Sequence, residues 1–174
     1  VMVDFSYKRP VLEEMARRAR TITILDHHRT AEEDLRFWVR PYEMADAPDY
    51  FASLCQFEGS LPIRALFDMN RSGARITWDY YFPNVEPPKL LLHIEDRDLW
   101  RFALPKTREI QANVFSYPYD FGVWEELMNS DTTELARGGE AIERKHFKDI
   151  RELITVVTRD MKIGGHVVPV ANLP

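Results

Sequence analysis

Apolar and polar residues along the first half of the chain alternate between strand-like and helix-like spacing. Residues 1–5 (VMVDF) are mostly apolar and predict a short buried strand. Residues 11–20 carry apolar side chains at helical spacing, with acidic residues early and basic residues late, as the helix dipole favours. Residues 21–25 (TITIL) predict a second strand, and the capping-box pair Thr30 and Glu33 predicts that a helix follows it.

The same alternation returns after a less regular stretch. Residues 40–62 contain several prolines among aromatic residues, so we expect irregular structure there with a short strand near 50–54. Residues 63–69 (IRALFDM) predict a third strand, 70–73 (NRSG) a tight turn and 74–82 a helix. After the prolines that follow, the pattern is mostly helical, and the predicted helices are 89–99, 105–116, 120–129 and a long charged helix over 132–159.

Strands that alternate with helices indicate a parallel sheet covered by helices on both faces. We therefore expect an α/β protein of this kind, followed by a mostly helical C-terminal half. The core is placed over residues 1–130, and a long connecting helix with a tail over 131–174. Within that tail, residues 163–170 are either extended chain or a strand.

Composition narrows the class of protein. Of the 174 residues 45% are hydrophobic, which is enough for a core, and the length suits one domain with an appendage. No apolar run approaches the ~20 residues that span a bilayer, so no membrane partner is expected. The single cysteine, Cys55, can form neither an internal disulfide nor a thiolate metal cage. We therefore expect a cytoplasmic protein that binds any metal through His, Asp or Glu.

The charge balance limits the partners. The net charge is -5, from 23 basic and 28 acidic residues, which cannot neutralise the phosphates of long duplex nucleic acid. A local basic pocket for a small phosphorylated substrate or a short oligonucleotide remains compatible with this balance. Self-association into a homodimer is left open.

Candidate chemistry gathers where the first two predicted strands end. Asp4 lies near the end of the first strand, and Asp26, His27 and His28 follow the second. Carboxyl ends of parallel strands meet at one edge of a sheet, where ligands bind, so we expect these side chains to converge. A carboxylate and two imidazoles supply oxygen and nitrogen ligands for a metal ion, and Asp26 can orient a histidine ring. The alternative is a helix-entry loop in which Asp26 is a cap and both histidines are solvated.

Two further segments have patterns that fit either function or local structure. Asp96 and Asp98 alternate with a basic residue beside an apolar stretch, an arrangement that also occurs on solvated faces and in local ion pairs. Residues 70–73 can offer N–H groups to a phosphate at the start of a helix. An ordinary helix cap by Asn70 or Ser72 explains these residues better.

Taken together, these motifs resemble the DHH phosphoesterase superfamily, which includes RecJ-type exonucleases, oligoribonuclease-like enzymes, manganese pyrophosphatases and exopolyphosphatases. The resemblance covers nearly the whole chain and rests on VMVDFSYKR, LDHHRTA, DMNRSGARITW and IEDRDLW. It implies that the core domain holds two divalent ions, commonly Mn²⁺ with Mg²⁺ as the alternative. It also implies that the long helix leads to a smaller C-terminal domain.

The resemblance also implies roles for individual residues. Asp4 corresponds to the carboxylate that bridges both ions, His27 to a ligand of one ion, and Asp96 to a further ligand of that ion. His28 corresponds to a contact with the substrate phosphate or the transition state, and Asp26 to a ligand or a residue just behind the ligands. Carboxylates and histidine suit this two-ion phosphoryl chemistry better than thiolates do.

We therefore expect a metal-dependent phosphohydrolase core. Its substrate would be a phosphodiester or phosphoanhydride of a small nucleotide, a short oligonucleotide or polyphosphate. The alternative is a non-catalytic nucleotide- or phosphate-binding protein with a degraded site. The family's first motif would precede Val1 and its small C-terminal domain would follow Pro174, so we expect this stretch to lack the first strand and to be a weak catalyst. Asp98 is the next candidate ligand should Asp96 lie apart from His27.

Overall fold

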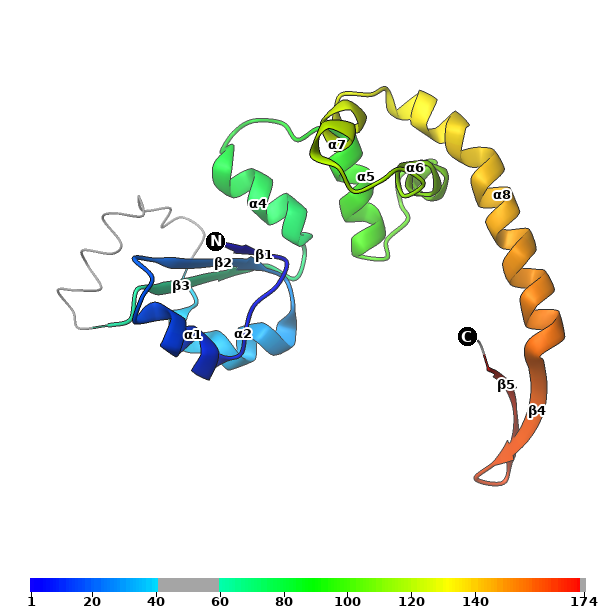
Figure 1. Cartoon of the computed structure of the whole chain (residues 1–174), viewed down its shortest axis with the longest axis horizontal. Coiled ribbons are helices and arrows are strands. Elements are labelled where there is room, and N and C mark those ends of the chain that lie inside the picture. Colours follow the sequence, from blue (N-terminus) through cyan, green and yellow to red (C-terminus); the bar gives the residue numbers. More distant parts are fainter. Residues whose placement is uncertain (41–59, 173–174) are drawn as a thin grey trace. The chain divides into compact units, whose positions relative to one another are not determined.

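The computed structural model describes residues 1–40 and 60–172, which form two compact units, Val1–Ala103 and Leu104–Pro174 (Figure 1). The first unit contains a three-stranded parallel sheet in the order β1-β2-β3. Its elements in chain order are β1 (Met2–Val3), α1 (Arg9–Ala16), β2 (Ile22–Asp26), α2 (Arg29–Leu35), the 3-10 helix η1 (Arg36–Trp38), β3 (Ile63–Phe67), α4 (Gly73–Tyr81) and α5 (Lys89–Asp98).

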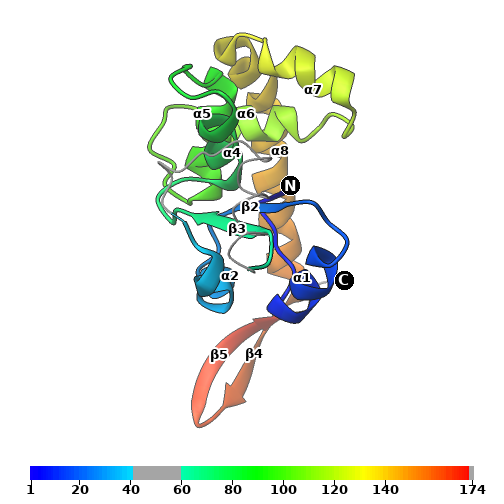
Figure 2. The same cartoon turned by 90° about the vertical axis from the view of Figure 1, so that its left-hand side faces the viewer.

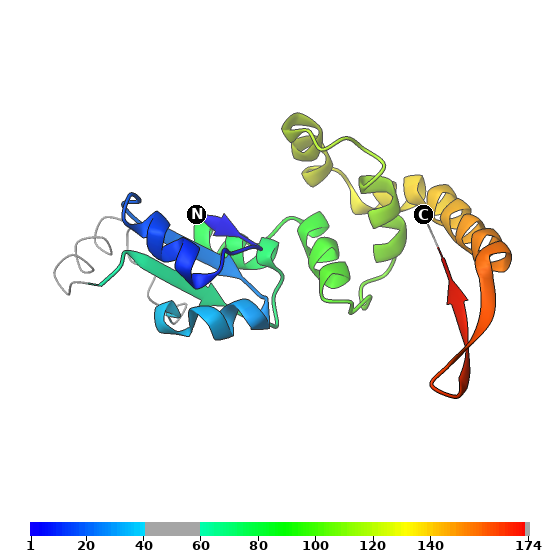
Figure 3. The same cartoon turned by 60° about the horizontal axis from the view of Figure 1, so that its bottom comes forward.

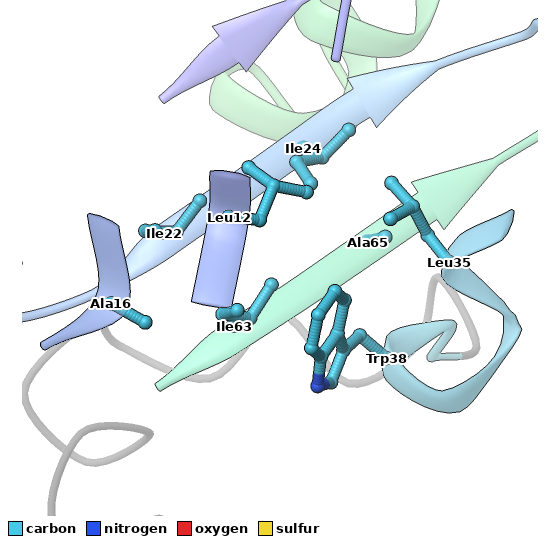
Figure 4. Packing of buried hydrophobic residues seen from close by; sticks show 8 residues of the cluster. All are labelled: Leu12, Ala16, Ile22, Ile24, Leu35, Trp38, Ile63 and Ala65. Carbon is cyan, nitrogen blue, oxygen red and sulfur yellow. The ribbon is translucent and has the colours of Figure 1, made fainter. Parts of the chain in front are cut away.

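Helices cover both faces of the sheet, so the predicted α/β class is confirmed. Ile24 of β2 packs in one buried cluster with Leu12 of α1 and Leu35 of α2 (Figure 4). The next residue, Leu25, packs in a second cluster with Ile76 of α4. Successive strand residues point to opposite faces, which explains why neighbouring residues of β2 serve different clusters. Figure 1 accordingly shows α1 and α2 on one side of the sheet and α4 on the other.

The start of α2 differs from the prediction. The helix begins at Arg29 with His28 as its N-cap residue, and no side chain caps it. The predicted capping box of Thr30 and Glu33 is therefore wrong, because Thr30 already lies inside the first turn. The predicted short strand near 50–54 lies outside the described residues.

The second unit is mostly helical, as predicted for the C-terminal half. Its elements are α6 (Thr107–Val114), α7 (Phe121–Met128), α8 (Thr132–Val157), β4 (Thr158–Ile163) and β5 (His166–Ala171). The strands β4 and β5 pair antiparallel, so residues 163–170 belong to a hairpin rather than to an extended tail. Figures 2 and 3 show α8 running directly into this hairpin.

The sequence predicts a division after residue 130, but the packing of α6 against α8 places the boundary elsewhere. Asn113 of α6 donates from Nδ2 to the carbonyl of Leu135 in α8 at 2.9 Å. A side-chain carbon built on Gly139 of α8 would lie 1.7 Å from the carbonyl oxygen of Glu109, so the two helices touch through their backbones. Helices packed this closely belong to one unit, and the chain divides after Ala103.

Within residues 1–40 and 60–172, none of the helices combines the length and the apolar character that a bilayer crossing requires.

Candidate metal centre

The parallel pairing of β1 with β2 brings the two acidic strand ends together. Val3 pairs with Leu25, and the backbone N–H of Asp4 donates to the Leu25 carbonyl at 2.8 Å. Asp4 therefore stands beside the end of β2, where the chain continues into His27. The Nε2 atom of His27 lies 3.0 Å from Oδ1 of Asp4. The expected convergence of these residues at the carboxyl edge of the sheet is thus observed.

Three side chains form the candidate centre, and a fourth lies beside it. One ligand atom from each of Asp4, His27 and His28 lies within 4.8 Å of the others. The fourth is Asp98, whose Oδ2 lies 3.4 Å from His27 Nε2. Two carboxylates and two imidazoles are a mixed oxygen and nitrogen donor set, which suits Mn²⁺ or Zn²⁺ better than Ca²⁺.

The acidic helix α5 presents Asp98 to His27, whereas the resemblance had pointed to Asp96. Asp96 is only 4% exposed, and its Oδ1 accepts the N–H of Ala103 at 2.8 Å, which holds the turn after the helix. Residues two apart on a helix point in nearly opposite directions, so both carboxylates cannot face the same histidine. The proposed ligand role therefore passes from Asp96 to Asp98.

The Asp26 side chain holds the backbone of His27 and His28, which follow β2, through hydrogen bonds. Its carboxylate is 1% exposed, and Oδ1 accepts the backbone N–H groups of His27 at 2.8 Å and His28 at 3.3 Å. The same oxygen lies 2.6 Å from Nδ1 of His28, and this hydrogen bond raises the pKa of the His28 imidazole. Nδ1 of His28 is thereby occupied, which leaves Nε2 for a ligand. This geometry favours the orienting role of Asp26 over the helix-cap alternative.

The second carboxylate oxygen of Asp26 indicates whether the surroundings of the site favour a cation. Oδ2 is buried and has no hydrogen-bond partner among the described residues. A buried carboxylate oxygen without a donor is costly, and a nearby positive charge would offset that cost. The donor set and this oxygen together fit a bound divalent cation.

Asp4 is held in a strained and crowded position. Its backbone φ is 58°, in the left-handed region that residues other than glycine rarely adopt. A side-chain carbon built on Gly73, the first residue of α4, would lie 2.5 Å from Cβ of Asp4, so the start of this helix abuts the carboxylate. Burial, and then the charge of Asp98, raise the pKa of Asp4. Two carboxylates that repel each other in this way favour a cation between them.

The contact between Gly73 and Asp4 is supported by a network of charged side chains that the sequence reveals only in part. Glu95 of α5 is buried and accepts the N–H of Ser72 at 3.2 Å. Arg71 donates to Asp68 at 2.8 Å and to Asp79 at 2.7 Å. These bonds fix the turn before α4, and so they fix where Gly73 meets Asp4. Local spacing suggests the Asp68–Arg71 pair, but not the bonds to Asp79 and Glu95, which come from α4 and α5.

The interpretation of the 70–73 turn as a helix cap is confirmed. Ser72 is the N-cap residue of α4, and its hydroxyl accepts the N–H of Arg75 at 3.1 Å. The turn is therefore explained by local capping, and its contribution to the site is the close approach of Gly73 to Asp4.

Comparison with curated proteins gives a viral relative. The chain is 32% identical over 136 residues to "Uncharacterized protein R106" of Acanthamoeba polyphaga mimivirus, a name that states no activity. The match covers 78% of this chain but only 27% of the viral protein, so the chain spans about a quarter of its relative. No protein-family model and no solved structure matches the chain.

Proposed function

We propose that this chain carries the core of a divalent-metal-dependent phosphohydrolase of the DHH type. The observation that supports it is the convergence of Asp4, His27, His28 and Asp98 at the carboxyl edge of a parallel sheet. The substrate class is a phosphodiester or phosphoanhydride of a small nucleotide or another short phosphorylated molecule, since the net charge of -5 does not favour long nucleic acid. Mn²⁺ is the proposed ion, with Mg²⁺ as the alternative, and one cysteine in 174 residues supports a cytoplasmic setting.

In this proposal, three side chains bind the metal ion and His28 binds the substrate phosphate. The carboxylates of Asp4 and Asp98 and Nε2 of His27 would hold the ion, which when bound polarises a phosphoryl oxygen and lowers the pKa of a bound water. His28 is more exposed, with 57% of its side chain accessible, and is anchored through Nδ1 to Asp26. Its Nε2 is therefore the atom that meets a phosphate oxygen. Because Nδ1 is bonded to the Asp26 carboxylate, a hydrogen bond from Nε2 to a phosphate oxygen uses the protonated ring.

The ligand set also leaves the binding-protein alternative worth testing. Within the described residues, the centre consists of Asp4, His27 and His28, with Asp98 beside His27. This set suffices for one ion, whereas phosphoryl transfer in two-ion sites uses a second ion to stabilise the leaving oxygen. A protein that holds one ion and a phosphate without turnover is thus the second candidate.

Metal affinity and hydrolysis, measured on the same variants, separate these possibilities. We would titrate Mn²⁺ by calorimetry and assay hydrolysis of bis-p-nitrophenyl phosphate and of the dinucleotide pApA. Asp4→Asn keeps a side chain that tolerates positive φ, and His27→Gln removes the imidazole. The matched controls are Asp160→Asn and His166→Gln, because both residues are exposed on the β4–β5 hairpin.

The proposed function predicts that Asp4→Asn and His27→Gln each lower Mn²⁺ affinity and reduce the hydrolysis rate at least about 100-fold. The two controls should behave like the unaltered chain. Mn²⁺ binding that depends on Asp4 and His27 but brings no hydrolysis would favour the binding-protein alternative. Absence of both metal binding and hydrolysis would overturn the proposal.

A further inference from the structure

A pocket beside the candidate metal centre is lined partly by aromatic and basic side chains that have no role in phosphate hydrolysis. Its volume is about 250 Å³, and its lining includes Asp4 and His28 of the centre. The lining also includes Phe5, Tyr7 and Lys8, from the loop between β1 and α1. This volume lies below the ~300–1,000 Å³ of typical small-molecule sites, so it has room for one small ring system rather than for several.

The two aromatic residues of this loop are exposed without a role in the core. Phe5 is 49% exposed and Tyr7 46% exposed, and neither belongs to the buried clusters of the first unit. Their rings meet edge to face with centroids 4.9 Å apart, so each supports the other in a fixed orientation. Exposed aromatic rings beside charged groups are the groups on which nucleic-acid bases stack.

The charges of the pocket favour a nucleoside over a bare phosphate chain. Lys8 is exposed and, in the described part of the chain, has no ion pair, so its ammonium can meet one phosphate group. Asp26 and Asp34 also line the pocket, and Oδ2 of Asp34 accepts the N–H of Arg9 at 3.1 Å. These carboxylates would repel the many negative charges of a polyphosphate. The Asp34 carboxylate would accept a hydrogen bond from the amino group of a base or from a ribose hydroxyl.

We propose that Phe5 and Tyr7 form a nucleoside subsite, in which a base stacks on the face of one ring, the other ring supports that ring edge to face, and the phosphate faces the metal centre. The placement of the phosphate rests on the proposed function, whereas the stacking of the base rests on the pocket alone. The subsite would select nucleotides over inorganic polyphosphate among the proposed substrates. It would give a preference for the base itself, with little demand on its identity, because every base has an aromatic face.

Binding of two probes that differ only by the base tests this subsite. We would measure the dissociation constants of AMP and of ribose 5-phosphate by calorimetry on the whole chain with Mn²⁺ present. The variants are Phe5→Leu and Tyr7→Leu, which keep apolar bulk and lose the ring, and Tyr7→Phe, which keeps the ring. Phe121→Leu is the matched control, because Phe121 is 96% exposed in the second unit and outside the pocket.

The unaltered chain should bind AMP about 10-fold or more tightly than ribose 5-phosphate. Phe5→Leu and Tyr7→Leu should each lose most of this preference while leaving the affinity for ribose 5-phosphate unchanged. Tyr7→Phe and Phe121→Leu should keep the preference. Equal affinity for the two probes, or a preference that survives both leucine variants, would overturn the subsite.

The same measurements separate this inference from the proposed function. A base preference that depends on Phe5 and Tyr7 supports the subsite even if no variant hydrolyses a phosphodiester. Hydrolysis of pApA that proceeds equally well in the leucine variants, with an unchanged KM, would count against the subsite and leave the phosphohydrolase proposal standing.

Discussion

Asp4 combines a strained backbone, a crowded side chain and a charged neighbour. Its backbone φ is 58°, and its Oδ1 lies 3.0 Å from Nε2 of His27. Strain of this kind costs about 1–3 kcal/mol and persists where the surroundings enforce it. The enforcing contact is Gly73, because any larger residue there would collide with the Asp4 side chain.

Gly73→Ala tests this contact without changing any charge. The added carbon would lie 2.6 Å from Oδ1 of Asp4, so the carboxylate must move. We expect a loss of about 1–3 kcal/mol in the free energy of unfolding, and at least about 10-fold weaker Mn²⁺ binding. Urea unfolding and calorimetry measure these quantities. Gly122→Ala in α7 is the control for Mn²⁺ binding, because it lies in the second unit, away from the candidate ligands. Unchanged Mn²⁺ affinity in Gly73→Ala would refute the contact's role.

Asp68 should make the stability of the first unit sensitive to acid. Burial raises its pKa, but the N–H of Asn70 and the guanidinium of Arg71 outweigh that effect and hold the pKa below the ordinary 3.8. A lowered carboxyl pKa stabilises the fold above pH 3.8, and this contribution disappears as the pH falls through the folded-state pKa.

Asp68→Asn should therefore destabilise the chain by about 1 kcal/mol at pH 7 and by progressively less below pH 3.8. Urea unfolding at a series of pH values would show the two curves converging in acid. Asp160→Asn, which alters an exposed carboxylate in the hairpin, should show no such convergence. A difference for Asp68→Asn that stays constant down to the most acidic point would contradict the assignment.

The contact between α6 and α8 depends on two consecutive glycines of the long helix. Gly138 faces the side chain of Asn113, whereas Gly139 faces the backbone carbonyl of Glu109. The charged pattern of residues 132–159 predicts a helix well, but it does not show that the helix is pressed against α6 here. Glycine costs a helix roughly 1 kcal/mol relative to alanine, and the close packing offsets that cost.

Gly139→Ala should separate the two helices. Its new carbon would lie 1.7 Å from a carbonyl oxygen that cannot rotate away, so we expect a cost of at least about 3 kcal/mol. Gly138→Ala should cost less, because its nearest neighbour, at 2.9 Å, is the end of the Asn113 side chain. Thermal unfolding followed by circular dichroism ranks the two variants. The reverse order, or a stabilised Gly139→Ala, would contradict the packing.

The whole chain consists of two units that each have their own packed interior. Leu12 is fully buried in the first unit, and Gly139 is buried in the second. Their effects on stability should be independent, since residues without shared partners usually add within about 0.5 kcal/mol.

The double variant Leu12→Ala with Gly139→Ala tests this independence. Its loss in the free energy of unfolding should equal the sum of the two single losses within about 0.5 kcal/mol. Leu12→Ala alone should cost about 2–5 kcal/mol in unfolding of the first unit and should weaken Mn²⁺ binding through that unit. Gly139→Ala should leave Mn²⁺ affinity unchanged, because the candidate ligands all lie in the first unit. A Gly139→Ala variant that binds Mn²⁺ differently would show that the two units are energetically coupled.

The sequence alone determined most elements of the first unit and the edge of the sheet at which its candidate metal ligands lie. Hydrophobic periodicity is a local property, so it placed β2, β3, α4 and α5 within a few residues of their observed bounds. Parallel connectivity then required Asp4 and His27 to share one edge, and the structure brings them to 3.0 Å.

Only the tertiary structure decided which groups complete the centre. Asp96 and Asp98 are equivalent by spacing, and the rotation of α5 about its axis determines that Asp98 faces His27. The contact of Gly73 with Asp4 depends on how α4 packs, which no local pattern records. The boundary after Ala103 follows from the packing of α6 on α8. Each of these features joins residues far apart in the chain, and such pairings depend on helix rotation and packing rather than on periodicity.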